Sequence, residues 1–276
     1  MLKIRNLLVN AVNSSFNLKF LDKNSIIYLE GHNMKLIIVE NYEEASIEAS
    51  KVMLEVVKNN PTANLGLATG STPIRMYELM IEDHKENGTS YKDIKSFNLD
   101  EYFGLEASHP QSYHYFMNKH LFSGIDIKLE NVHVPNGAGE IQESCDDYNK
   151  LLAENPIDIQ LLGIGSNGHI GFNEPGTSFD SVTHMIELKE STRQDNARLF
   201  FDGKIDDVPT HAITMGISNI MQAKKVLLVA CGENKAEPIK VLVEGQKTTD
   251  VPASALQDHS DVVVIVDKAA ASLLTK

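Results

Sequence analysis

Four polar segments, well separated in the chain, carry side chains that could do chemistry. The first is Thr69-Gly70-Ser71-Thr72-Pro73, which follows an apolar run and precedes a helical pattern. Gly70 allows a tight turn, and the hydroxyls of Ser71 and Thr72 would then lie with free amides at the positive end of the helix. Such a segment predicts an anion site, although it lacks the lysine of a Walker loop. The alternative is an ordinary helix start, with Ser71 or Thr72 as N-cap and Pro73 at the first helical position.

The second segment is Asp100-Glu101-Tyr102, directly after the predicted strand 96–99. A carboxylate at the end of a buried strand can act as a general base at carbon, which makes Asp100 a candidate catalytic residue. Taken alone, the segment is better described as a helix N-cap or a surface acidic pair.

The third segment is the glycine-rich run from Gly163 to Pro175, which contains Asn167, His169 and Glu174. Its glycines predict a tight turn out of a strand, which would bring His169 to the strand end. Glu174 could then orient the imidazole and select its tautomer. A dinucleotide fingerprint is excluded because the run continues toward Pro175 as a loop and does not open a helix.

The fourth segment is a pair of cations, Arg193 and Lys235. Lys235 lies where a loop meets the next helix, and a cation is disfavoured at that positive end unless an anion is bound there. Arg193 is described equally well as a solvated surface arginine.

The elements that must position these residues alternate between strands and helices. Strands are predicted at 36–39, 65–68, 96–99, 157–162, 212–215, 226–230 and 262–266, and helices at 43–58, 73–85, 112–121, 141–154 and 235–244. Most strand candidates are continuous Val/Ile/Leu runs, typical of strands covered on both faces. We therefore predict an α/β fold: a three-layer αβα sandwich with a mostly parallel, Rossmann-like sheet. Ligands bind outside the carboxyl ends of such strands, where the four segments would lie.

Composition narrows the class of protein. With 276 residues and 42% hydrophobic content, the chain can form one large domain, and the formal net charge of -13 argues against nucleic-acid or anionic-membrane partners. Cys145 and Cys231 have no CxxC spacing, which argues against a disulfide framework or a zinc site and favours a cytoplasmic setting. No apolar run approaches the roughly 20 residues of a membrane span.

The N-terminal residues 1–33 differ in pattern from the rest of the chain. Their apolar stretches are interrupted by Asn, Lys and Ser, whereas Met34 opens a strand-like run. We expect residues 34–276 to form a single domain. Residues 1–33 are either an extension outside the native fold or an arm packed on the surface.

Taken together, the polar segments closely resemble the glucosamine-6-phosphate deaminase family. The matching runs are 67–73, 98–102 and 165–175, then Thr192-Arg193 with Asn196 and Arg198, and Gly232 with Lys235-Ala236. The resemblance covers essentially everything from Met34 onward.

The resemblance implies a role for each segment. Gly70, Ser71 and Thr72 would hold the phosphate with Lys235 and with Arg193, the latter on a lid. His169, oriented by Glu174 and Asn167, would open the sugar ring, and Asp100 would move the proton from C2 to C1. No metal or organic cofactor is implied. The expected partner is a small sugar phosphate, and the expected state is a monomer or small homo-oligomer.

Two departures from the family pattern matter. Many members have aspartate where this chain has Asn167, and an amide cannot stabilise an imidazolium by its charge. In allosteric hexameric members, a second phosphate site uses basic residues at the positions of His184 and Ile186. The alternative functions are a 6-phosphogluconolactonase-like hydrolase and a sugar-phosphate-sensing module.

Overall fold

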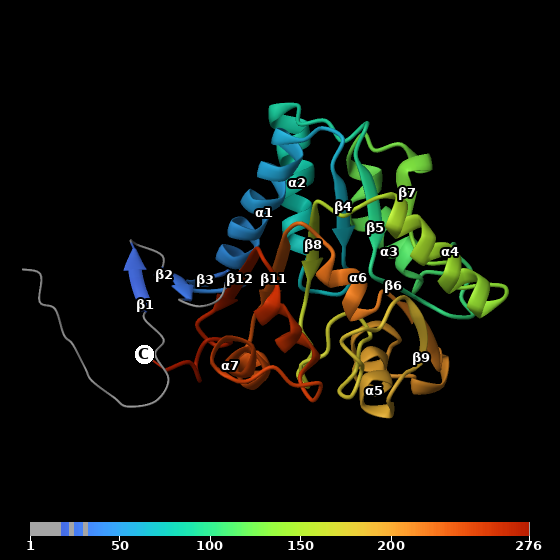
Figure 1. The fold of residues 1–276 in the computed structure, drawn as a ribbon. Helices are drawn as coiled ribbons and strands as arrows, with labels where there is room; N and C mark the ends of the chain where they lie inside the picture. Colours follow the sequence, from blue (N-terminus) through green and yellow to red (C-terminus); the bar gives the residue numbers. More distant parts are fainter. Residues whose placement is uncertain (1–17, 22–24, 30–32, 276) are drawn as a thin grey trace, which may run out of the picture.

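A computed structural model describes residues 18–21, 25–29 and 33–275 (Figure 1). Its main sheet has the strand order β1-β2-β3-β12-β11-β8-β4-β5-β7, and the strands from β3 to β7 in this order run parallel to one another. These parallel strands are β3 (Met34–Val39), β4 (Asn64–Leu67), β5 (Lys95–Asn98), β7 (Val132–His133), β8 (Ile159–Leu162), β11 (Val226–Ala230) and β12 (Val262–Asp267).

Helices cover both faces of this sheet, so the predicted α/β layers are confirmed (Figure 1). The helices that follow parallel strands are α1 (Tyr42–Asn59), α2 (Ile74–Asn87), α4 (Ile141–Glu154) and α7 (Ala236–Glu244). Helices α3 (Tyr113–His120) and α6 (Ile217–Met221) follow strands of the second sheet described below. Short 3-10 helices complete the connections: η1 (Phe122–Gly124), η2 (Leu129–Asn131), η3 (Ile205–Asp207), η4 (Glu233–Lys235) and η5 (Pro252–Asp258).

The main core lies between the sheet and these helices. Every residue of β11 and β12 is buried, and these strands consist of Val, Leu, Ile and Ala apart from the terminal Asp267. A strand that is apolar on both faces needs cover on both faces, which explains why the continuous apolar runs predicted the parallel sheet.

Two antiparallel strands extend the sheet beyond β3. They are β1 (Leu18–Leu21) and β2 (Ser25–Leu29), and β2 pairs with β3 from Ser25 opposite Ile38 to Leu29 opposite Met34. Part of the predicted N-terminal extension is therefore hydrogen-bonded to the domain. The rest, residues 1–17, 22–24 and 30–32, lies outside the described residues, so the proposed division at residue 33 stays a prediction.

A second, three-stranded sheet has the order β6-β10-β9 and is antiparallel. Its strands are β6 (Asp100–Tyr102), β9 (His184–Glu187) and β10 (His211–Thr214), and α5 (Glu190–Phe200) follows β9. The prediction that 212–215 belongs to the parallel sheet was wrong. Ala212 and Ile213 are fully buried, so the segment is as apolar as a central strand, although it pairs with β6 and β9. We call this sheet with α5 and its core the small sheet unit.

The core of the small sheet unit is largely aromatic. Tyr102, Phe172, Leu188, Ala197, Phe201, Val208 and Ala212 form a separate buried cluster. The Tyr102 ring lies 4.8 Å from Tyr113, 5.9 Å from Phe172 and 5.9 Å from Phe201. Rings from β6, α3, the loop after β8 and the end of α5 therefore hold this unit against the rest of the fold.

The start of α2 differs from the alternative considered from sequence. Pro73 occupies the N-cap position, and the helix has no side-chain cap. An ordinary capped helix start with Ser71 or Thr72 as N-cap is therefore wrong. The amide groups of this helix end stay directed at the loop before it.

Candidate active site

The predicted polar segments meet in one cavity of about 450 Å³. It lies beyond the carboxyl ends of β4, β5, β8 and β11, where parallel α/β sheets bind ligands. The side chains and backbone segments that line it include Ala68–Thr72, Leu99, Asp100, Tyr113, Gly163–Asn167, His169, Gly171, Phe172, Asn196, Arg198, Asn234 and Lys235.

The loop between β4 and α2 forms one wall of this cavity. Gly70 has φ 96°, a left-handed conformation that glycine adopts without strain. Behind the loop, the Tyr42 hydroxyl donates to the Ser71 carbonyl oxygen at 3.1 Å and accepts from the Arg75 amide at 3.2 Å. Tyr42 thus ties α1 to the loop, and Ser71 and Thr72 line the cavity.

Asp100 lies where the chain leaves β5 and enters β6. Only 6% of the residue is exposed, and burial, followed by the nearby Glu101 carboxylate, raises the pKa of Asp100 to about 8. A carboxyl group tuned in this way can accept and return a proton near neutral pH.

Glu101, next to Asp100, has a different role. Its carboxylate accepts hydrogen bonds from the backbone N–H groups of Tyr102 at 2.8 Å, Tyr113 at 2.9 Å and His114 at 2.9 Å. It therefore joins β6 to the first turn of α3 and positions Tyr113 on the cavity wall. Neither member of the Asp-Glu pair is a surface residue, so that alternative was wrong.

The imidazole of His169 packs against a glycine. A Cβ added at Gly165 would lie 2.3 Å from His169 Cε1, so a larger residue at this position would displace the ring. His169 Nδ1 lies 3.7 Å from Glu174 Oε1. The structure thus brings together the histidine and the carboxylate that the sequence predicted to orient it.

Asn167 completes this group of side chains. Its Nδ2 donates to Glu174 Oε2 at 2.7 Å, and its Oδ1 accepts from the His169 backbone N–H at 3.2 Å. Asn167 therefore holds the Glu174 carboxylate in place. An aspartate here would instead set two like charges against each other unless one carried a proton.

The predicted cations are placed differently from each other. Lys235, in the N-cap position of α7, lines the cavity, as does Arg198 of α5. Arg193 does not line it: its guanidinium donates to the carbonyl oxygens of Ile205 at 2.8 Å and Val208 at 3.1 Å. In this conformation the cation that reaches the cavity from α5 is Arg198, which the sequence marked only as part of a motif.

Two other cavity residues were given no role from sequence, although Asn196 was part of the matching motif. Tyr113 and Asn196 both line the wall, and Asn196 Nδ2 donates to the Tyr102 hydroxyl at 2.7 Å. Tyr113 follows Ser112, whose hydroxyl caps α3 by accepting from the Tyr115 amide. The cap signal predicts where the helix begins, but not that its first residue faces the cavity.

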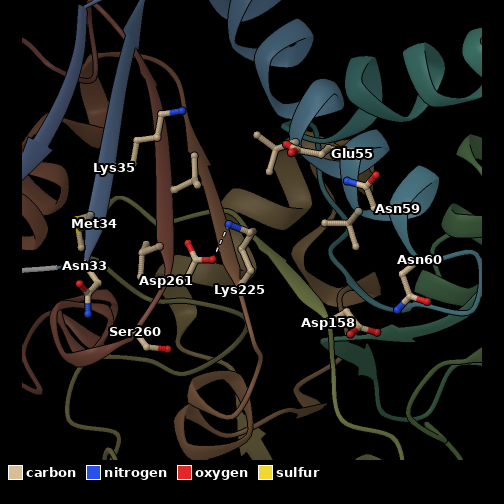
Figure 2. Close-up of a pocket in the computed structure, with 14 residues that line it drawn as sticks. Asn33, Met34, Lys35, Glu55, Asn59, Asn60, Asp158, Lys225, Ser260 and Asp261 are labelled. Carbon is tan, nitrogen blue, oxygen red and sulfur yellow. Dashed lines mark ion pairs between the residues drawn. The ribbon is translucent and has the colours of Figure 1, made fainter. Parts of the chain in front are cut away.

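A larger hollow, of about 720 Å³, lies at the opposite end of the parallel strands, near the start of β3 and β12 (Figure 2). Lys225 and Asp261, which both line it, point toward each other and form an ion pair at 2.6 Å. It contains none of the predicted site residues and lies at the amino ends of the strands. The 450 Å³ cavity is therefore the candidate active site.

Two further features concern metal ligands and membrane-spanning helices. Within the described residues, no cluster of three or more His, Cys, Asp or Glu side chains is arranged to hold a metal ion. None of the helices in this described part is long and apolar enough to cross a membrane.

The chain is similar to known proteins over most of its length. The family model for glucosamine-6-phosphate isomerases and 6-phosphogluconolactonases matches residues 40–265. A glucosamine-6-phosphate deaminase of Geobacillus sp. (strain WCH70) is 52% identical over 243 residues, covering 87% of this chain and 96% of that protein. The same enzyme of Clostridium perfringens (strain 13 / Type A) is 51% identical over 243 residues, covering 87% of this chain and all of that protein.

Solved structures share the fold. A monomeric glucosamine-6-phosphate deaminase superposes with a TM-score of 0.83 at 47% identity, covering 86% of this chain and 99% of that one. A 6-phosphogluconolactonase of Trypanosoma cruzi superposes with a TM-score of 0.71 at 20% identity, covering 87% of this chain and 97% of that one. The second likeness concerns the fold alone. From its matched length and its identity to these relatives, the chain belongs to the family of glucosamine-6-phosphate isomerases and 6-phosphogluconolactonases.

Proposed function

We propose that this protein is a glucosamine-6-phosphate deaminase, which converts glucosamine 6-phosphate and water to fructose 6-phosphate and ammonia. One observation carries the proposal: a single cavity joins an anion-binding loop, a histidine with its carboxylate, and a buried carboxyl group. The relatives at about 50% identity that carry the deaminase name support it.

The phosphate is bound first, at the loop Gly70-Ser71-Thr72. Free amides at the start of α2 and the two hydroxyls donate to the phosphate oxygens. Lys235 and Arg198 line the same cavity and supply positive charge in a protein with a net charge of -13. Arg193 joins them only if its guanidinium leaves the carbonyl oxygens of Ile205 and Val208.

Ring opening follows at the His169 imidazole. The imidazole accepts the proton of the sugar's O1 hydroxyl and gives a proton to the sugar ring oxygen, O5. The C1–O5 bond then breaks, and C1 becomes an aldehyde. Glu174, held by Asn167, orients the imidazole for both transfers.

Isomerisation then uses Asp100. Its carboxylate takes the proton from C2 while the aldehyde oxygen O1 takes up a proton from solvent, which gives an enolamine. The Asp100 carboxyl group then returns its proton to C1 while the amine releases one to solvent, which leaves an imine at C2. Water adds to the imine carbon and ammonia leaves. The aldehyde and the amine of the substrate hold the electrons throughout, so no cofactor is part of the proposed chemistry.

Two coarser properties complete the proposal. The expected setting is the cytoplasm, which agrees with two cysteines that are both free. The expected state is a monomer or small homo-oligomer, and the related deaminase structure at 47% identity is monomeric.

Purified protein tests the function directly. We expect ammonia and fructose 6-phosphate from glucosamine 6-phosphate, and no comparable hydrolysis of 6-phosphogluconolactone. Lactone hydrolysis without ammonia release would make the protein a lactonase, and tight binding of sugar phosphate with neither reaction would make it a sensor.

A second assay tests the role of His169. Replacing His169 with Gln should slow turnover of the cyclic substrate more than C2 hydrogen exchange on an open-chain analogue that binds. Equal losses in both assays would place His169 in the carbon proton transfer or in structural support.

A further inference from the structure

Several polar side chains lie near the Glu174 carboxylate, and one of them, Lys189, was not predicted from sequence. Glu174 is 3% exposed, and it lies 3.7 Å from His169 Nδ1 and 2.7 Å from Asn167 Nδ2. A further neighbour is Lys189, whose Nζ lies 3.9 Å from Glu174 Oε2. A buried carboxylate without a compensating charge is costly, and Asn167 supplies a hydrogen bond but no charge.

Lys189 occupies an unusual position for a cation. It is the N-cap residue of α5 and makes no side-chain cap hydrogen bond. The positive end of a helix disfavours a lysine unless an anion lies near it. The Glu174 carboxylate is such an anion, and it lies on a different segment, the loop after β8. The pair therefore connects α5, which carries Asn196 and Arg198, to the side chains proposed to open the sugar ring.

We propose that Lys189 is a positioning residue for ring opening: its ammonium group, 3.9 Å from Oε2, holds the Glu174 carboxylate in the place from which it orients His169. This inference rests on the proposed deaminase function. It adds a residue to that site and a link between the small sheet unit and the acid–base chemistry.

Removing Lys189 should slow ring opening. Without the ammonium group, the Glu174 carboxylate loses an attraction that fixes its direction, and the His169 imidazole is then less often aligned with the O1 hydroxyl. An arginine can restore this attraction, whereas a methionine or a glutamine cannot.

Other charged groups face the same region and must be held constant. Asp100, Arg198 and Lys235 line the cavity, and the segment packed against Gly168 and Gly176 carries the exposed Asp250. None of them changes when Lys189 is replaced, so a comparison of variants isolates the Lys189–Glu174 pair.

The ring-opening step can be observed separately from deamination. In an Asp100→Asn background the C2 step is blocked, and opening and reclosing of the ring interconvert the α and β anomers of glucosamine 6-phosphate. Exchange NMR measures that interconversion as a function of pH, after subtraction of the rate with His169→Gln added to the same background.

We expect Lys189→Met in this background to slow the His169-dependent anomer exchange about threefold. The effect is modest because 49% of the Lys189 side chain is exposed, where solvent screens the ion pair. Lys189→Gln should behave like Lys189→Met, and Lys189→Arg should restore the original rate. Lys51→Met, which removes an exposed lysine on α1, is the control for net charge and should leave the rate unchanged.

A double-mutant cycle completes the test. With Glu174→Gln already present, Lys189→Met should produce no further slowing, because the carboxylate through which it acts is gone. An unchanged exchange rate in Lys189→Met and Lys189→Gln, or a slowing that persists without Glu174, overturns the inference. Failure of the unmodified protein to release ammonia is a separate result, which would overturn the proposed function.

Discussion

The main sheet and the small sheet unit differ in the side chains that form their cores. The strands β11 and β12 are aliphatic and fully covered, and together with the flanking helices they form a large continuous core. The small sheet unit depends on a few rings around Tyr102 and on hydrogen bonds such as Asn196 to the Tyr102 hydroxyl. We therefore expect the main sheet to contribute most of the stability of the fold. The small sheet unit, through α5, holds part of the cavity wall in place. Changes in the two regions should therefore have different consequences.

Asp100 lies at the junction of the two regions, and its replacement should have the largest effect on catalysis. Asp100→Asn preserves the shape and removes the proton acceptor, so we expect turnover to fall about 10²–10⁴-fold and C2 hydrogen exchange to be lost. Near-normal turnover with C2 exchange in solvent deuterium would remove Asp100 from the mechanism.

The same variant should be more stable than the original protein in alkaline solution. Because the pKa of Asp100 is raised to about 8 in the fold, the unfolded chain releases this proton at lower pH than the folded chain does. Stability therefore falls as pH rises from about 4 to 8. We expect Asp100→Asn to melt a few degrees above the original at pH 8.5, with a smaller difference at pH 5. For the same reason, kcat/KM of the original protein should rise with pH as it approaches 8.

A cavity in the main sheet should reduce stability but not substrate binding. Leu228, in the centre of β11, is fully buried, and Leu228→Ala should lower the free energy of unfolding by about 3–5 kcal/mol. At temperatures where the variant is folded, KM for glucosamine 6-phosphate should stay within twofold of the original. A strongly raised KM with unchanged melting temperature would contradict the division between the regions.

Three cationic side chains should differ in their contribution to phosphate binding. Lys235→Ala should raise KM for glucosamine 6-phosphate by about 10–100-fold, since a charge-assisted hydrogen bond is worth roughly 1.5–3 kcal/mol. Arg198→Ala should also raise KM if α5 keeps its present conformation, and Arg193→Ala should then affect mainly stability. A larger effect of Arg193 than of Arg198 on KM would show that α5 rearranges when substrate binds.

A change in the aromatic core should affect catalysis more than its effect on stability suggests. Phe201→Leu removes an edge-to-face contact with Tyr102, worth about 0.5–1.5 kcal/mol. Because Tyr102 holds Asn196 on α5, we expect kcat/KM to fall a few-fold with only a small drop in melting temperature. If kcat/KM changes no more than in Leu228→Ala, the aromatic core does not position the cavity wall.

The smallest expected effect concerns regulation, and it is located on β9. N-acetylglucosamine 6-phosphate should not activate the enzyme, and the rate should be hyperbolic in substrate. His184 Nδ1 lies 2.8 Å from the Val182 carbonyl oxygen, and Ile186 is apolar, so these positions offer little charge to a second phosphate. Sigmoidal kinetics that become hyperbolic on addition of that ligand would reveal a regulatory site elsewhere.

The sequence by itself determined which segments matter and the class of fold. Strands formed by continuous apolar runs must be covered on both faces. Polar residues that follow such strands must lie at the same end of the parallel strands, the carboxyl end. Asp100, His169 and Lys235 could be found by this argument because each directly follows, or lies within a few residues of, a buried strand. The ends of the predicted elements agreed with the structure to within a few residues, since caps and apolar periodicity are local signals.

Only the tertiary structure decided the contacts between distant segments. Residues 212–215 read as a central strand, but their partner strands are β6 and β9, and burial alone cannot name a partner. Arg193 and Arg198 lie on one helix, and only packing shows that Arg198 lines the cavity. The ion pair of Lys189 with Glu174 and the capping of α3 by Glu101 are also invisible in the sequence. Each depends on how two segments approach in space, which no local pattern of residues encodes.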